Sequence, residues 1–85
     1  MEDYIEHVEK NGGIVDLTVK DNYTAARVYS KGDSRVAYFD TEENFTGLVD
    51  SYGRVVVKDS VTDAKRVVKN FLARKTWNYD DRKRN

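Results

Sequence analysis

The chain of 85 residues contains no cysteine and no proline. Without cysteine it can form no disulfide framework, no zinc–thiolate site and no thiol nucleophile. Without proline, glycines and polar turn residues are the only breaks between secondary-structure elements. The longest aliphatic run is Val55–Val57, so no membrane partner is expected. Residues 1–10 are acidic where a secretion signal would be basic, and we therefore expect a cytoplasmic protein.

Groups suited to catalysis or metal binding are also scarce. The one histidine is His7, and a single histidine with scattered carboxylates such as Asp3 and Glu6 is weak evidence for a metal site. We interpret it as a surface histidine. No serine stands in a G-x-S-x-G context, and no Gly-Lys-Ser/Thr follows Gly12-Gly13 as a phosphate loop requires. The sequence therefore predicts no enzyme and no cofactor.

What is present is the hydrophobic pattern of one α+β domain. The length predicts a single domain over residues 1–79, with 80–85 as a disordered basic tail. Tyr4, Ile5 and Val8 form an apolar stripe that predicts a short helix over 2–10. A second, longer helix is predicted from the N-cap Ser60 to about Thr76, because apolar residues recur there at helical spacing.

Between these helices the pattern predicts an antiparallel sheet of four or five strands, arranged as a meander. Strands are expected over 14–20, 23–30, 35–40 and 54–58, with a turn over 31–34. In the first of them, Val15, Leu17 and Val19 alternate with polar residues, which is typical of a half-buried strand. Residues 41–53 fit either a helix or a strand over 45–49. Weak helix formers, including the interior Gly47, favour the strand.

Net charge is zero, but it is unevenly distributed along the chain. Residues 1–53 hold five Lys and Arg against eleven Asp and Glu, a net charge of −6. Residues 54–85 hold ten against four, a net charge of +6. Such a division indicates either an acidic and a basic face or two parts that neutralise each other in the fold.

Two groups of residues are candidates for a protein-binding surface. Tyr23, Arg27 and Tyr29 fall on one side of their predicted strand, and tyrosine and arginine are common in binding hot spots. The same pattern also fits aromatic pairs that only stabilise a sheet, and a terminal helix covering each face would hide it. Glu42 and Glu43 belong to an acidic set that would attract a basic partner if its members were contiguous.

The basic end of the chain is a candidate for nucleic-acid binding. Its cationic side chains would contact phosphates, and Trp77 would stack on bases. The plainer interpretation is an ordinary solvated helix face, with Trp77 folded back over the core. The cationic candidates are Lys65, Arg66, Lys69, Arg74 and Lys75.

One stretch of the chain resembles the WGR domain. The resemblance rests on Tyr52-Gly53-Arg54-Val55, on Phe71–Thr76 at the end of a helix, and on Asn78 and Arg82. It implies contact with DNA. The chain departs from that family after Val55, where valines replace a glycine-rich stretch, and the predicted strand order also differs. We therefore do not assign the chain to this family.

The sequence supports three functional hypotheses. The first is a small non-catalytic module that binds a partner protein and inhibits or regulates it, a format common among phage and mobile-element proteins. The second is a nucleic-acid-binding protein that uses the basic C-terminal helix and tail. The third is a homo-oligomeric structural protein whose acidic and basic faces meet.

Overall fold

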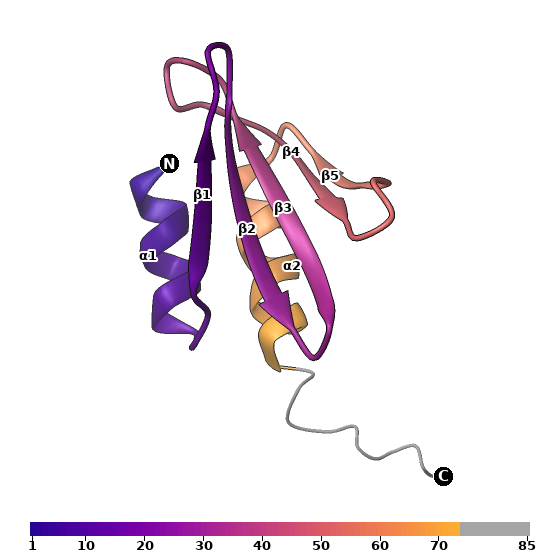
Figure 1. Ribbon diagram of the computed structural model, residues 1–85. Helices are drawn as coiled ribbons and strands as arrows, with labels where there is room; N and C mark the ends of the chain where they lie inside the picture. The colour runs from indigo at the N-terminus through magenta and orange to yellow at the C-terminus, as the bar shows by residue number, and fades with distance from the viewer. Residues whose placement is uncertain (74–85) are drawn as a thin grey trace, which may run out of the picture.

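A computed structural model describes residues 1–73 of the chain. The predicted tail over 80–85 and the last residues of the predicted C-terminal helix lie outside these described residues. Along the chain, one helix precedes five strands and a second helix follows them (Figure 1). Their bounds are α1 Glu2–Lys10, β1 Val15–Val19, β2 Thr24–Ser30, β3 Asp33–Phe39, β4 Phe45–Asp50, β5 Val55–Lys58 and α2 Val61–Ala73.

The five strands form one antiparallel meander, and this confirms the predicted α+β fold. Each strand pairs with the next in the chain, in the order β1-β2-β3-β4-β5. The ambiguous segment contains strand β4, so the strand interpretation is confirmed and the helix interpretation is wrong. Phe45 pairs with Phe39 and Leu48 with Ala37; Leu48 is buried in the core, and Phe45 packs against it.

The β2–β3 turn is shorter than the sequence predicts. Strand β3 begins at Asp33, and the turn consists of Lys31 and Gly32, whose φ angles are 49° and 78°. Two consecutive residues with positive φ match the twist of a tight hairpin. The predicted four-residue turn over 31–34 was therefore too long, because Asp33 already pairs with Ser30.

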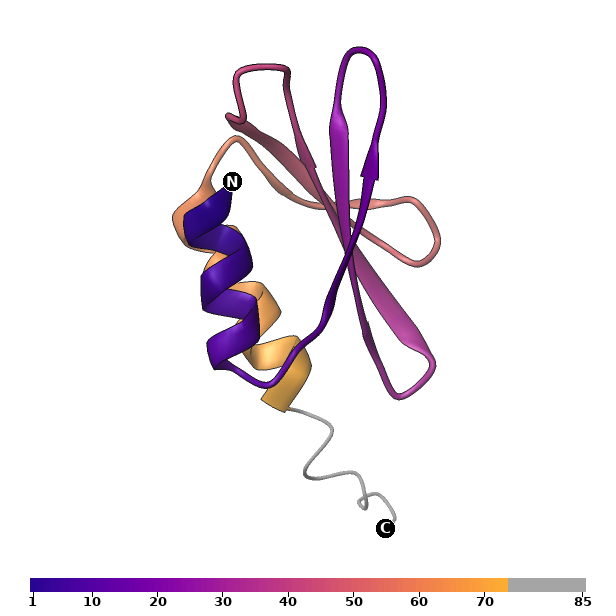
Figure 2. The same ribbon diagram turned by 60° about the vertical axis from the view of Figure 1, so that its left-hand side comes forward.

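Both helices lie side by side on one face of the sheet, and they run in the same direction (Figure 2). α1 buries Tyr4 and Val8 against the sheet and α2. The side chain of Ser60 caps α2 as predicted, since its Oγ accepts a hydrogen bond from the Asp63 N–H at 3.2 Å. The residues that α2 contributes to the core are Ala64, Val68, Phe71 and Leu72. No helix among residues 1–73 is both long and apolar enough to span a membrane.

Strand β1 is more exposed than its alternating pattern predicts. Leu17 and Val19 are on the helix side of the sheet, opposite Ala26 and Thr24, yet they are 45% and 74% exposed. Only Val15, at the start of the strand, packs against the core. The β1–β2 hairpin extends past the two helices (Figure 2), so there is nothing in the helical layer to cover its outer half. The prediction of a half-buried strand was therefore wrong beyond Val15.

Candidate functional site

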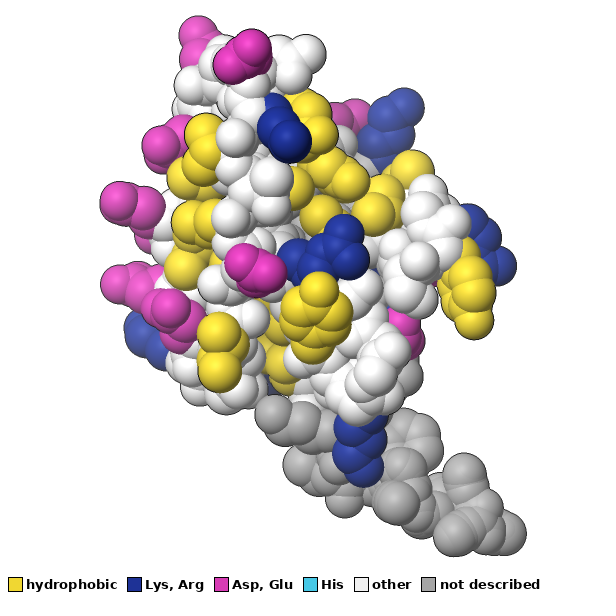
Figure 3. All heavy atoms as spheres, in the orientation of Figure 1, with side chains coloured by type: hydrophobic (Ala, Val, Ile, Leu, Met, Phe, Trp, Pro, Cys, Tyr) yellow, Lys and Arg dark blue, Asp and Glu magenta, His cyan; other side chains and the backbone are white. Residues whose placement is uncertain are grey.

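The face of the sheet opposite the helices is the first candidate surface, and we call it the open face. No helix among residues 1–73 covers it, because α1 and α2 share the other side (Figures 1 and 2). Figure 3 views the molecule from this side, with apolar side chains gathered over the sheet and acidic side chains along the margin formed by α1. The possibility that one helix covers each face is thereby excluded for the described helices.

The open face brings together Tyr23, Arg27 and Tyr29, as the sequence predicts. Arg27 and Tyr29 alternate with buried Val28 along β2, so both side chains project from the open face. Tyr23 precedes the strand and makes an edge-to-face contact with Tyr38 of β3, with ring centroids 5.6 Å apart. Tyr23 is 38% exposed and Tyr29 is 58% exposed. These side chains are therefore accessible as well as aligned.

The middle of the open face is apolar and well packed. Val36 pairs with Arg27 on one side and with Val49 on the other, and it is only 3% exposed. Ser34, opposite Tyr29, is also buried. Because no helix overlies these two residues, the larger side chains beside them must shield them from water. The result is a floor made by Val36 and the small Ser34, bordered by tyrosines and one arginine.

Glu42 and Glu43 do not join this surface. They lie in the turn between β3 and β4, at the end of the sheet near the start of α1. The Glu43 carbonyl oxygen accepts a hydrogen bond from the N-terminal ammonium of Met1 at 3.3 Å. Glu43 also lines a hollow of about 200 Å³ together with Tyr4 and Val61, on the helix side of the sheet. The two predicted sets of protein-binding residues therefore occupy different places.

The β3–β4 turn that carries these glutamates is organised by Asp40. One carboxylate oxygen of Asp40 accepts hydrogen bonds from the backbone N–H groups of Glu42 and Asn44, each at 2.9 Å. The backbone N–H of Asn44 contributes most to holding the pKa of Asp40 below its usual value. Asp40 therefore has a structural role in the turn.

The basic candidates on α2 lie beside the acidic helix α1. Arg66 and Lys69 are exposed, and Lys65 is half-buried. Arg66 forms a salt bridge with Asp63 of its own helix at 2.8 Å. Within residues 1–73, no salt bridge joins α1 to α2. Arg74, Lys75 and Trp77 lie outside the described residues.

His7 lies between the two helices and is more than a surface residue. Its Nε2 atom is 2.9 Å from the carbonyl oxygen of Lys65 in α2. A carbonyl only accepts hydrogen bonds, so Nε2 carries the proton in this contact. The sequence interpretation of a surface histidine was wrong because the packing of α1 on α2 cannot be read from local spacing. Among the described residues, no group of His, Cys, Asp and Glu side chains is close enough together to hold a metal ion.

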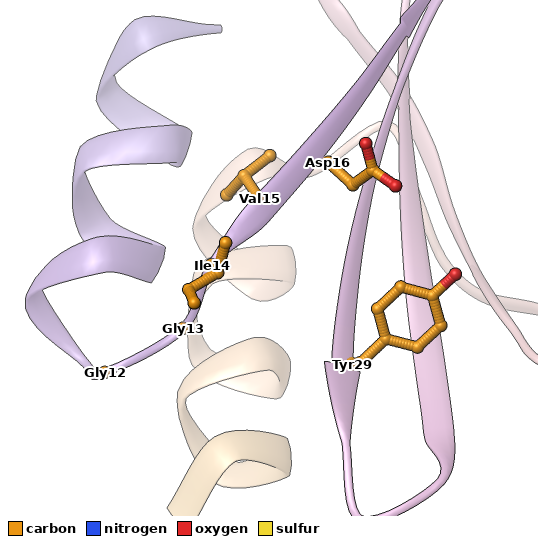
Figure 4. A pocket seen from close by; sticks show the side chains of 6 residues that line it. All are labelled: Gly12, Gly13, Ile14, Val15, Asp16 and Tyr29. Atoms are coloured by element: carbon orange, nitrogen blue, oxygen red, sulfur yellow. The ribbon is translucent and has the colours of Figure 1, made fainter.

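A hollow that the sequence did not reveal lies where β1 and β2 separate. It has a volume of about 510 Å³ (Figure 4). Val15 is the first residue of β1 that pairs with β2, so the preceding residues diverge from Tyr29 and leave a space. The residues that line it are Gly12, Gly13, Ile14, Val15, Asp16 and Tyr29.

Comparison with known proteins finds no matching family, no matching curated protein and no matching solved structure. The resemblance to the WGR domain therefore remains an observation on the sequence, and part of it falls on residues beyond Ala73.

Proposed function

We propose that the protein is a non-catalytic binding module that recognises a partner protein with the open face of its sheet and thereby regulates it. The single observation that carries this proposal is the position of both helices on one side of the sheet, which leaves Tyr23, Arg27 and Tyr29 accessible on the other. The proposed anchors are Tyr29 and Arg27, with Tyr23 held in place by its contact with Tyr38.

The chemistry of this face fits a protein partner. Tyrosine and arginine are enriched among the few interface residues that contribute most of the binding energy. Val36 and Ser34 are closely packed at the base of this face, and a preorganised surface loses little conformational entropy when a partner docks. Arg27 is the residue of this set that distinguishes partners by charge, and it favours an acidic group opposite it.

The nucleic-acid hypothesis has weaker support from the described residues. α1 presents acidic side chains next to the basic side chains of α2, and this lowers the positive potential that would attract phosphates. The salt bridge between Arg66 and Asp63 further reduces the charge available on α2. The acidic residues concerned are Glu2, Asp3, Glu6 and Glu9.

An affinity capture with matched variants tests the proposal. The wild-type chain is immobilised and exposed to a lysate of the organism that carries the gene, alongside the variants Arg27→Glu and Tyr29→Ala. The expected result is a protein that wild type retains at moderate salt and both variants lose. Tyr52→Ala is the matched control, because Tyr52 is an exposed tyrosine in the β4–β5 turn, two strands across the sheet from the strand that carries Tyr29.

Three outcomes would contradict the proposal. One is retention of the same proteins by wild type and by Arg27→Glu. A second is a band shift with nucleic acid at low salt that Lys69→Glu abolishes and Tyr29→Ala leaves unchanged, which supports the basic-helix hypothesis. A third is sedimentation of the purified chain as an oligomer that dissociates at high salt, which supports assembly through oppositely charged faces.

A further inference from the structure

Strand β1 is an open edge of the sheet within residues 1–73. It pairs with β2 on one side, and no described strand pairs with its other side (Figure 1). It contains no proline, and its pairing with β2 has no register shift. The opposite edge strand, β5, is one residue shorter and pairs with β4 across a register shift. A regular edge strand without a bulge or proline is a template for one more strand, so β1 is the better template of the two.

The alternation of hydrogen bonds shows which backbone groups face this edge. The backbone N–H of Lys20 donates to the carbonyl oxygen of Tyr23 at 2.8 Å, where β1 turns into β2. In an antiparallel pair, residues that are hydrogen-bonded to the neighbouring strand alternate with residues that are not. Counting back from Lys20, every second residue of β1 bonds to β2. The N–H and C=O groups of the residues between them, which include Leu17 and Val19, therefore point to the open edge.

The side chains of the same two residues are apolar and uncovered. Leu17 is 45% exposed and Val19 is 74% exposed, on the part of the hairpin that extends past the helices (Figure 2). A strand that paired with β1 would place its own side chains beside them. Pairing would therefore satisfy backbone groups and remove apolar surface from water in one step.

The margin of the sheet at β1 is acidic. Residues 1–22, which include α1, β1 and the turn after it, hold six Asp and Glu against two Lys, a net charge of −4. Figure 3 shows acidic side chains along this margin. The exposed carboxylates of α1 are Glu2, Asp3, Glu6 and Glu9.

This charge distinguishes between possible occupants of the edge. Antiparallel pairing of β1 with the β1 strand of a second copy would place both α1 helices on the same side of the joint sheet. The two acidic margins would then repel each other. A partner strand with basic side chains would instead meet opposite charge.

We propose that the β1 edge is a docking site for an extended segment of a partner protein, which adds to the sheet as a sixth, antiparallel strand. The segment alternates apolar and basic side chains. Its apolar side chains cover Leu17 and Val19, and its basic side chains project on the other side, where Asp16 lies opposite Arg27. The segment lies beside the sheet and not over it, so Tyr29 stays accessible. This inference therefore does not depend on the proposed function of the open face.

A synthetic peptide that alternates lysine with valine tests the proposal, with a peptide that alternates glutamate with valine as its control. In NMR spectra of the full chain, the lysine peptide is expected to shift the amide resonances of Leu17 and Val19 and to slow their hydrogen exchange. The amides of Val55 and Val56, in the opposite edge strand, should not respond. Unchanged β1 amides with the lysine peptide, or equal changes with the glutamate peptide, would overturn the proposal.

Methylated peptides separate strand pairing from attraction between charges. In the proposed pairing the valine N–H groups of the peptide face β1 and the lysine N–H groups face away. N-methylation of the valines is therefore expected to abolish binding, and N-methylation of the lysines to preserve it. Equal binding of the two methylated peptides would overturn the proposal.

Variants of the chain locate the site. Leu17→Lys is expected to lose binding of the lysine peptide, and Val55→Lys, at an exposed position of β5, is the matched control that should keep it. Equal binding by both variants would overturn the proposal. Slow hydrogen exchange at Leu17 and Val19 in the chain without peptide would also overturn it, because the edge would then already be paired within this chain or with a second copy.

Discussion

The Nε2 atom of His7 lies 2.9 Å from the backbone carbonyl oxygen of Lys65, and this contact joins α1 to α2. Replacing His7 by alanine removes the donor and opens space between the helices. We expect His7→Ala to lower the free energy of unfolding by about 1 kcal/mol, the usual net contribution of one hydrogen bond. Urea denaturation followed by circular dichroism measures the change. Glu9→Ala, at an exposed position of the same helix, is the control. An equal loss of unfolding free energy in both variants would contradict the hydrogen bond between His7 and the Lys65 carbonyl.

A second prediction concerns Gly13, where α1 ends against α2. A Cβ added to Gly13 would lie 2.7 Å from Cγ1 of Val8 and 3.1 Å from Cδ1 of Leu72. Both neighbours are buried, so they have little room to move. Overpacking of this kind costs about 1–3 kcal/mol, and we expect Gly13→Ala to lower the free energy of unfolding by that amount.

Gly47 provides the matched control for this substitution. Its added Cβ would meet only the backbone oxygen of Val57, at 3.7 Å, which is an ordinary contact. A glycine inside a strand is less favourable than alanine by roughly 0.5–1 kcal/mol, so Gly47→Ala should be neutral or stabilising. If Gly13→Ala were as stable as Gly47→Ala, the close packing of Gly13 against Val8 and Leu72 would be wrong.

These two glycines show where sequence reasoning succeeds and where it stops. The helix predicted over 2–10 ends at Lys10, and Gly12, two residues later, has the positive φ of 86° that glycine adopts easily. Gly13 is needed for a different reason: an added Cβ would meet Val8, five positions before it, and also Leu72, which lies 59 positions further along the chain. Local patterns predict elements and turns because their causes are local. They do not predict which elements approach each other closely.

The same limit applies to the candidate surfaces. Alternation along β2 correctly placed Arg27 and Tyr29 on one side of the strand, but only the packing of both helices on the other side shows that they are accessible. Leu17 and Val19 follow the same alternation and remain exposed, because no helix reaches the outer half of β1. The hollow beside Tyr29 depends on where β1 and β2 separate, and no spacing in the sequence specifies that point.

The hydroxyl group of Tyr4 provides a third prediction. Tyr4 is fully buried against Phe39, with ring centroids 5.6 Å apart, and its hydroxyl has no hydrogen-bond partner among residues 1–73. A buried polar group without a partner costs about 1–3 kcal/mol. We therefore expect Tyr4→Phe to raise the free energy of unfolding by about 1 kcal/mol in urea denaturation. Tyr4→Ala is the comparison, and it should be destabilising by about 3–5 kcal/mol because it leaves a cavity. A clear loss of stability in Tyr4→Phe would indicate that the hydroxyl has a partner.

The same residue predicts a loss of stability at alkaline pH. Burial raises the pKa of Tyr4 well above its ordinary value of 10.0. Above about pH 10 the unfolded chain releases this proton while the folded chain keeps it, so the free energy of unfolding falls as pH rises. In the Tyr4→Phe variant the free energy of unfolding should fall less steeply with pH, between pH 10 and the alkaline limit of folding, than in wild type. Urea denaturation at fixed ionic strength measures it. Identical slopes for the two proteins would contradict the burial of this phenol.

The last prediction concerns the β4–β5 turn and acidic pH. One carboxylate oxygen of Asp50 accepts hydrogen bonds from the backbone N–H groups of Tyr52 and Arg54, at 2.9 and 3.0 Å. Its other oxygen accepts one from Nε of Arg54 at 3.1 Å. The backbone N–H of Arg54 contributes most to lowering the pKa of Asp50 below its usual 3.8. The folded chain therefore holds this carboxylate charged at pH values where the unfolded chain binds a proton.

It follows that Asp50 contributes stability above the unfolded-state pKa, and that this contribution is lost as pH falls through the folded-state value. Asp50→Asn should lower the free energy of unfolding at neutral pH. It should also reduce the fall of the free energy of unfolding with decreasing pH below about pH 4. Asp40→Asn should behave in the same way, since Asp40 makes the equivalent pair of hydrogen bonds in the β3–β4 turn. Glu42→Gln, in that same turn, removes one negative charge but keeps the hydrogen bonds, and so controls for net charge. If Glu42→Gln flattened the acid decline as much as Asp40→Asn, the loss of general negative charge would explain the effect and the turn geometry would not.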